Sequence, residues 1–167
     1  METNLEGIYA VGDVVGGYLL AHVAFEEGVV AAENALGIDS KIDYTSVPNC
    51  IFTSPQIGGV GLTLDKAKEE GIEVKLARFP FAASGKAQAM GEAEGFLQLI
   101  VEKGNGGILG GQIIGSHAAD LIHEIALAIR WGLTTEQVAS TIHAHPTFSE
   151  AIMEAAKKAE GKPRHLI

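Results

Sequence analysis

The chain has 167 residues, and its 12 Lys and Arg against 21 Asp and Glu give a formal net charge of −9. This acidic balance argues against nucleic-acid binding, which needs clustered positive charge. No apolar stretch reaches the roughly 18 residues of a membrane span. The start at Met1 lacks the pattern of a secretory signal, and the single Cys50 excludes an internal disulfide framework, so we expect a cytoplasmic protein.

The first forty residues contain one predicted strand and one predicted helix. Gly7–Val11 is a short apolar run that ends at Gly12, which is typical of a strand buried on both faces of a parallel sheet. Leu19–Leu36 has the composition of a helix with apolar residues on several sides. A lone strand leaves backbone donors and acceptors that need neighbouring strands. We therefore expect residues 1–40 to be the end of another domain.

From residue 41 onward, strands come first and helices last. The predicted strands are Val47–Phe52, Gly58–Leu62, Val74–Phe79, Gly95–Lys103 and Ile108–Ile114. The predicted helices are Leu64–Glu70, Ala118–Trp131, Thr135–Thr141 and Phe148–Ala159. This order predicts an α+β fold for a domain of residues 41–167, with an antiparallel sheet and helices packed on one face.

The helix predicted at Ala118–Trp131 is apolar over more than one face. Its apolar residues are Leu121, Ile122, Ile125, Ala128, Ile129 and Trp131. One core contact needs a stripe about 100° wide. The excess indicates either a helix enclosed within one core or a symmetric dimer interface.

Two histidines and a glutamate stand near the C-terminus, in the sequence from His143 to Glu150. Pro146 disfavours the helical conformation for His145, so His145 is expected to be extended just before a helix. Glu150 could then accept a hydrogen bond from one imidazole nitrogen and leave the other nitrogen as a base. Alternatively, Thr147 and Glu150 form a capping box, in which Glu150 bonds only to the backbone. The spacing leaves both open, although one carboxylate cannot easily serve both roles.

A metal site is the other chemistry that these side chains could support. His143 and His145 share one face if extended, and His117, His123 and Glu124 belong to or flank the preceding helix. Such ligands could hold zinc. Because nothing in the sequence fixes their distances and no thiolate pair is present, we expect no native metal.

The octet His143–Glu150 resembles the C-terminal signature of the dihydrolipoamide dehydrogenases, a family of flavoprotein disulfide oxidoreductases. The stretch Gly7–Val14 is similar to the last flavin-contacting strand of that family, and Leu19–His22 to the start of the helix that follows it. Ser54–Gln56, Phe79–Phe81 and Ile113–Trp131 also match in order. The resemblance therefore covers nearly the whole chain.

The resemblance implies a role for each matching residue. His145 would be the acid/base that moves a proton during dithiol–disulfide exchange, in which the thiolate is the nucleophile, and Glu150 would orient it. The His145–Pro146 peptide bond would be cis. The residues that would contact FAD are Asp13, Leu19, Leu20, Ala21 and His22, the last four through their backbone at a helix N-terminus.

The resemblance also implies what the intact enzyme would use. It would oxidise protein-bound dihydrolipoamide through a redox disulfide and FAD to reduce NAD, as a homodimer served by the lipoyl domain of a 2-oxo acid dehydrogenase or glycine cleavage complex. This chain contains neither the Gly-rich dinucleotide fingerprint nor a cysteine pair, so we expect an inactive fragment with no bound cofactor. The alternatives are a non-catalytic, free-standing dimerisation module and another flavin disulfide reductase.

Overall fold

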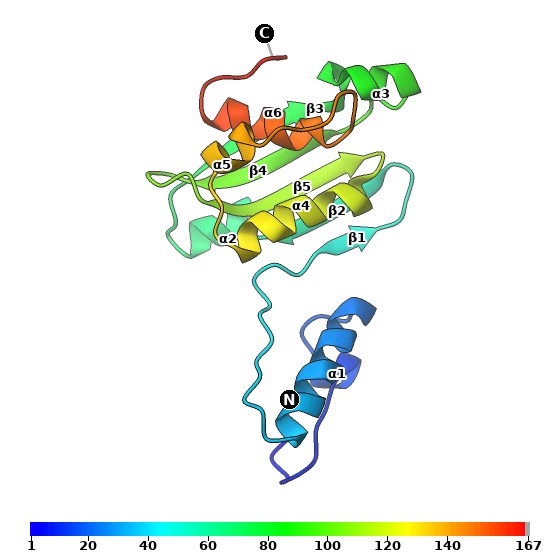
Figure 1. Ribbon diagram of the computed structural model, residues 1–167, viewed down its shortest axis with the longest axis vertical. Coiled ribbons are helices and arrows are strands. Elements are labelled where there is room, and N and C mark those ends of the chain that lie inside the picture. The colour runs from blue at the N-terminus through cyan, green and yellow to red at the C-terminus, as the bar shows by residue number, and fades with distance from the viewer. Residues whose placement is uncertain (166–167) are drawn as a thin grey trace. The chain divides into compact units, whose positions relative to one another are not determined.

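The computed structural model describes residues 1–165 and divides the chain into two compact units, Met1–Tyr44 and Thr45–Ile167. Figure 1 shows the helix-containing N-terminal unit in blue and the sheet-containing unit in cyan to red. None of the helices in the described part of the chain is long and apolar enough to cross a membrane.

The N-terminal unit contains a short 3₁₀ helix, η1 (Gly12–Val15), and helix α1 (Ala21–Ala35). The prediction of a strand at Gly7–Val11 is wrong: the structure has only an isolated bridge between Glu2 and Tyr9 there. A strand needs adjacent strands to pair its backbone groups, and within residues 1–44 the only such pairing described is that bridge.

Helix α1 confirms the predicted helix, with shorter ends. Val23, Val30 and Ala31 are buried within the unit. Several large apolar side chains remain exposed: Val14, Leu19, Phe25, Val29 and Leu36. This distribution agrees with a helix whose apolar residues face several sides.

The second unit is built on an antiparallel sheet, which confirms the predicted α+β fold. Its described strands are β1 (Asn49–Ile51), β2 (Gln56–Gly61), β3 (Val74–Pro80), β4 (Phe96–Glu102) and β5 (Ile108–Gly115). They lie in the order β1-β2-β5-β4-β3, and every neighbouring pair is antiparallel. Side chains alternate along β4, where Leu97, Leu99 and Val101 enter the core.

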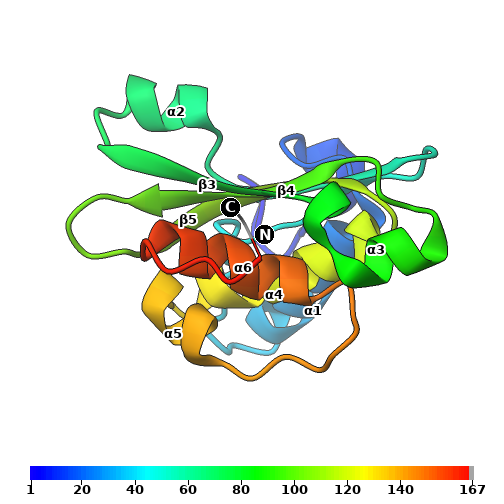
Figure 2. The same cartoon turned by 90° about the horizontal axis from the view of Figure 1, so that it is seen from above.

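The helices of this unit are α2 (Leu64–Glu69), α3 (Gly85–Met90), α4 (Ala118–Arg130), α5 (Thr135–Ser140) and α6 (Glu150–Ala159). Helix α4 packs on β2 and β5, and α6 packs on β3 and β4. Figure 2 shows both helices on the same face of the sheet. Helix α3 was not predicted from the sequence. The hydroxyl of Ser84 caps it by accepting from the Ala87 amide, and Gly91 ends it in a left-handed conformation.

Two glycines of the sheet allow α4 to lie close to it. A Cβ atom on Gly58 would approach the carbonyl oxygen of Ala118 to 2.7 Å, and one on Gly111 would approach Ile125 to 2.8 Å. A side chain at Gly58 would collide with the backbone of α4, and one at Gly111 would collide with the side chain of Ile125. The position of α4 is therefore fixed by close packing.

Candidate active site

The segment between α5 and α6, residues 141–149, carries the predicted catalytic histidine. It has neither helix nor strand over residues 141–149, and the His145–Pro146 peptide bond is cis, as predicted. The hydroxyl of Thr147 donates to the carbonyl oxygen of Ala144 at 2.7 Å. This bond closes the backbone around His145 and Pro146.

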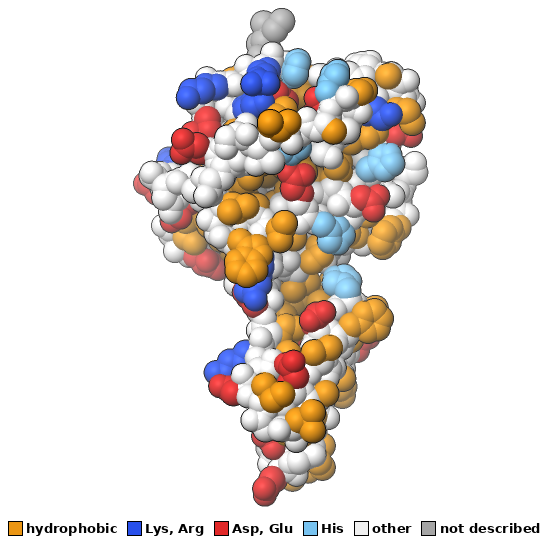
Figure 3. Space-filling view, viewed as in Figure 1, with side chains coloured by type: hydrophobic (Ala, Val, Ile, Leu, Met, Phe, Trp, Pro, Cys, Tyr) orange, Lys and Arg blue, Asp and Glu red, His pale blue; other side chains and the backbone are white. Residues whose placement is uncertain are grey.

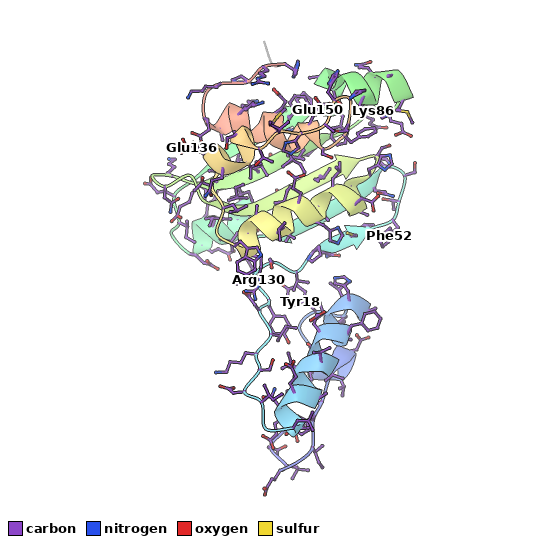
Figure 4. All side chains as sticks on the ribbon, in the orientation of Figure 1. Tyr18, Phe52, Lys86, Arg130, Glu136 and Glu150 are labelled. Carbon is purple, nitrogen blue, oxygen red and sulfur yellow. The ribbon has the colours of Figure 1, made fainter. Side chains whose placement is uncertain are left out.

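Glu150 is the first residue of α6, and Figure 4 shows it at the start of that helix. Its Oε1 is 2.9 Å from Nδ1 of His145, and its Oε2 accepts from the backbone amide of Thr147 at 2.9 Å. The structure thus brings together the two predicted site residues. The expectation that Glu150 could not serve both His145 and the backbone is wrong, because its two oxygens divide the roles.

The helix cap also differs from the capping-box alternative. The N-cap of α6 is Ser149 and not Thr147, and no side-chain bond to this cap occurs in the described residues. Glu150 therefore bonds to the backbone before the helix, and this contact adds to the histidine contact instead of replacing it.

The carboxyl of Glu150 is tuned by opposing effects. Burial raises its pKa, but the hydrogen bonds from the Thr147 amide and from His145 lower it, as do the charges of His145 and His165. The lowering effects prevail, so the pKa of Glu150 lies below its ordinary value. An ionised Glu150 is an acceptor, and it therefore holds the proton of His145 on Nδ1.

The remaining nitrogen of His145 is available for chemistry. Its side chain is 74 % exposed, whereas that of Glu150 is 17 % exposed. With Nδ1 donating to the carboxylate, Nε2 carries the lone pair and can accept a proton. The pair has the arrangement of a general base and the group that orients it.

Two cavities border this pair. One, of about 330 Å³, is lined by His145, Glu150, His143, Lys157 and His165 among others. The other, of about 320 Å³, is lined by the same His145, Glu150 and His165 with Phe79 and Ser84. His165 was missed by the sequence analysis, and no motif marks it. It reaches the site because Glu154 of α6 accepts its backbone amide at 3.2 Å.

A second histidine–glutamate pair lies beside the first. Nε2 of His143 is 2.8 Å from Oε1 of Glu124 on α4. From the sequence, both residues are possible metal ligands, and His143 also opens the octet that carries the family resemblance. Within residues 1–165, no group of three or more His, Cys, Asp or Glu side chains could hold a metal ion.

The predicted flavin-contacting residues all belong to the N-terminal unit. Asp13 is exposed on η1, and Gly12 before it has a positive φ of 75°. Leu19 and Leu20 directly precede α1, while Ala21 and His22 begin it, and no side chain described here caps that N-terminus. The structure therefore places the five predicted residues on η1 and around the start of α1, within one unit.

Glu27 of α1 was not found from the sequence, yet it organises this unit. Its buried carboxylate accepts the backbone amide of Gly12 at 2.6 Å and the hydroxyl of Tyr44 at 2.8 Å. Burial raises the pKa of the Tyr44 phenol, and the adjacent Glu27 carboxylate raises it further. Glu27 thus fixes the backbone directly before Asp13.

The outer face of α4 carries both polar and apolar side chains, and its exposed residues are Asp120, His123, Leu127 and Arg130. Ile122, Ile125 and Ala128 are buried, whereas Leu127 and Trp131 at its end are exposed. Figure 3 shows hydrophobic side chains interspersed with acidic and histidine side chains on this face of the second unit. Leu121 and Ile129 pack partly buried against the core, so Trp131 is the one residue of the predicted apolar set that is exposed.

Comparison with known proteins agrees with this geometry. The dimerisation domain of the pyridine nucleotide-disulphide oxidoreductases matches residues 47–156. The chain is 47 % identical to dihydrolipoyl dehydrogenase from Bacillus subtilis and 50 % identical to that from Geobacillus stearothermophilus, each over 165 residues. These alignments cover 99 % of this chain but 35 % of each relative, so the chain spans about a third of their length.

Solved structures show the same relationship. LpdA from Mycobacterium tuberculosis has a TM-score of 0.87 at 30 % identity, over 93 % of this chain and 34 % of its own. The Cu(II) complex of the HOCl-induced flavoprotein disulfide reductase RclA from Escherichia coli has a TM-score of 0.86 at 25 % identity, over 94 % of this chain and 36 % of its own. The predicted resemblance is confirmed: the chain belongs to the pyridine nucleotide-disulphide oxidoreductase family, whose dimerisation domain it carries.

Proposed function

We propose that the chain is the C-terminal part of a cytoplasmic dihydrolipoamide dehydrogenase. In this proposal, residues 1–40 are the end of its FAD-binding domain and residues 41–167 are its interface domain. The observation that carries the proposal is the contact of His145 with Glu150 at 2.9 Å, with the imidazole exposed. The high identity to dihydrolipoyl dehydrogenases over 99 % of the chain supports the choice of substrate.

The proposed role of His145 is proton transfer at Nε2. A dihydrolipoamide thiol must lose its proton before its sulfur can attack a disulfide. Nε2 of His145 accepts that proton, and Glu150 stabilises the resulting imidazolium through Nδ1. The site can return the proton in the reverse direction by the same path.

FAD and NAD are the proposed cofactors of the intact enzyme. When bound, FAD would accept the electron pair. The residues of this chain that would hold it are Asp13, through its carboxylate, and Leu19–His22, through backbone groups at the start of α1. Glu27 would keep the backbone before Asp13 in place through the Gly12 amide.

The proposed assembly is a homodimer that presents its His145 to a partner chain and accepts a lipoyl domain as substrate carrier. The exposed apolar end of α4 supports this proposal, because a symmetric contact between two copies would cover Leu127 and Trp131. The match to a dimerisation domain supports it as well.

A chimera tests the proposed function. The matching third of the Geobacillus stearothermophilus enzyme is replaced by this chain, and NAD-dependent oxidation of dihydrolipoamide is measured. We expect an active chimera, in which His145→Gln lowers kcat by about 10²–10⁴-fold, the usual contribution of general acid–base catalysis. His123→Gln is the matched control, because His123 is an exposed histidine on α4, and it should leave kcat unchanged.

The other outcomes are equally informative. A kcat for His145→Gln close to that of the unmutated chimera would contradict the acid/base role. A chimera that dimerises without activity would favour a non-catalytic dimerisation module. A chimera that reduces or oxidises another disulfide substrate, but not dihydrolipoamide, would favour a different flavin disulfide reductase.

A further inference from the structure

His143 is the more enclosed of the two histidines in the segment that carries His145. Its side chain is 5 % exposed, and both of its nitrogens have a partner. Nδ1 lies 3.0 Å from the carbonyl oxygen of Thr141, and Nε2 lies 2.8 Å from Oε1 of Glu124. The ring is thus tied at once to its own segment and to helix α4.

Both partners of the His143 ring are acceptors. A carbonyl oxygen cannot donate, and neither can an ionised carboxylate. The ring is therefore held by two acceptors, one from the backbone of its own segment and one from the side chain of Glu124. The distance of 2.8 Å between Nε2 and the carboxyl oxygen lies in the range of a good hydrogen bond.

The other end of this contact belongs to a fixed element. Ile122 and Ile125 of α4 are buried, and the glycines at 58 and 111 hold the helix close to the sheet. Glu124 is therefore carried by a rigid backbone. The bond between Glu124 and His143 therefore attaches the irregular residues 141–149 to this rigid helix.

His145 depends on such support because its own side chain is not packed. It is 74 % exposed and is oriented by the one bond to Glu150. On its C-terminal side, Thr147 secures the backbone through bonds to Ala144 and Glu150. On its N-terminal side, His143 makes the corresponding attachment two residues earlier.

We propose that His143, held by Glu124, is a positioning residue that fixes the backbone of His145 so that Nδ1 meets Glu150. This inference rests on the proposed function for its catalytic meaning, since the positioned group is the proposed base. The contact itself belongs to the fold and exists without cofactor, substrate or partner. The proposal couples the position of α4 to the choice of the ring nitrogen that carries the proton of His145.

The test reads the tautomer of His145 directly in the 167-residue chain. Two-bond ¹H–¹⁵N spectra, recorded near pH 8 where an unperturbed imidazole is neutral, give the ratio of Nδ1–H to Nε2–H for each histidine. We expect Nδ1–H to predominate at His145 in the unmutated chain. In His143→Phe, which keeps a planar ring, the ratio should fall at least about twofold, the lower end of coupling within one hydrogen-bond network.

Two variants of the partner refine the test. Glu124→Leu removes the acceptor and should lower the ratio in the same direction, whereas Glu124→Gln keeps a neutral acceptor and should restore part of it. His123→Phe, one residue earlier and exposed, should leave the ratio unchanged. If His143→Phe does not fold, as judged by circular dichroism, the Glu124 variants carry the test, because 37 % of that side chain is exposed.

An unchanged His145 ratio in a folded His143→Phe or Glu124→Leu chain would overturn the inference and leave only a stabilising role. That result would not affect the proposed function, which is decided by the chimera. Conversely, a chimera indifferent to His145→Gln would remove the catalytic meaning, while the tautomer ratio would still report whether His143 positions His145.

Discussion

Glu150 holds Nδ1 of His145 at 2.9 Å, although 74 % of the His145 side chain is exposed and only 17 % of the Glu150 side chain is. The orienting acid is thus sheltered while the proposed base faces outward. This asymmetry is what a proton-transferring pair needs, because the base must reach a substrate and the acid must not be displaced by water.

The lowered pKa of Glu150 predicts how stability depends on pH. A carboxyl whose pKa is lower in the folded state binds fewer protons there than in the unfolded state, so it stabilises the fold above its ordinary pKa. This contribution is lost as the pH falls through the lowered value. We expect the unfolding free energy of the unmutated chain to exceed that of Glu150→Gln at neutral pH, and the difference to shrink below about pH 4.

Urea unfolding across this pH range measures the effect. Glu136→Gln is the matched control, since Glu136 is an exposed glutamate in the first turn of α5. A constant difference between the unmutated chain and Glu150→Gln at every pH would contradict the prediction.

The exposed end of α4 predicts self-association. We expect sedimentation at micromolar concentrations to give a dimer for the unmutated chain, and a monomer once Leu127 and Trp131 are both replaced by Glu. Charged groups in an apolar contact lose hydration without gaining a partner. Met90→Glu, at an exposed apolar position on α3, should leave the dimer intact. A monomeric unmutated chain would argue against the interface.

Gly115 predicts a packing penalty at the end of β5. A Cβ atom there would collide with the buried ring of Phe81, and the backbone φ of 144° disfavours other residues. We expect Gly115→Ala to lower the unfolding free energy by about 1–3 kcal/mol through overpacking alone. Gly59→Ala is the control, because no atom lies within 4 Å of its added Cβ. Equal stability of the two variants would contradict the packing argument.

Glu27 predicts the titration of Tyr44. Burial and the Glu27 carboxylate both raise the pKa of Tyr44 above 10.0, so Glu27→Gln should lower it toward that ordinary value while burial maintains part of the shift. NMR of ¹³C-labelled tyrosine rings follows each phenol separately. In the control Glu26→Gln, the Tyr44 titration should match that of the unmutated chain. If the Tyr44 titration in Glu27→Gln also matches it, the contact between Glu27 and Tyr44 is excluded.

The sequence predicted most of the sheet-containing unit because its signals are local. Alternating apolar residues in Phe96–Glu102 and the turn at Asn105 mark strands and a hairpin without reference to the rest of the fold. Helix α3 was not predicted because six residues are too few to show a periodic pattern. Its only signals in the sequence are the Ser84 cap and Gly91.

The candidate site likewise contains local contacts that the sequence predicts and long-range contacts that it does not. His145 and Glu150 lie five residues apart, so their spacing suggested a contact. The pairs of His143 with Glu124 and of Glu27 with Tyr44 join residues 19 and 17 positions apart. Such contacts depend on how helices pack, which spacing alone does not reveal. The strand predicted at Gly7–Val11 failed for the opposite reason, since apolar residues alone do not supply the neighbours that a strand requires.

Helix α4 presents Glu124 to one histidine and, three and seven residues later, Leu127 and Trp131 to the surroundings. A helix moves as a rigid unit along its length. A partner that packs against Leu127 and Trp131 therefore also affects the position of Glu124, which bonds to His143. Binding at that surface would therefore change the orientation of the His143 imidazole through one or two turns of the α4 backbone.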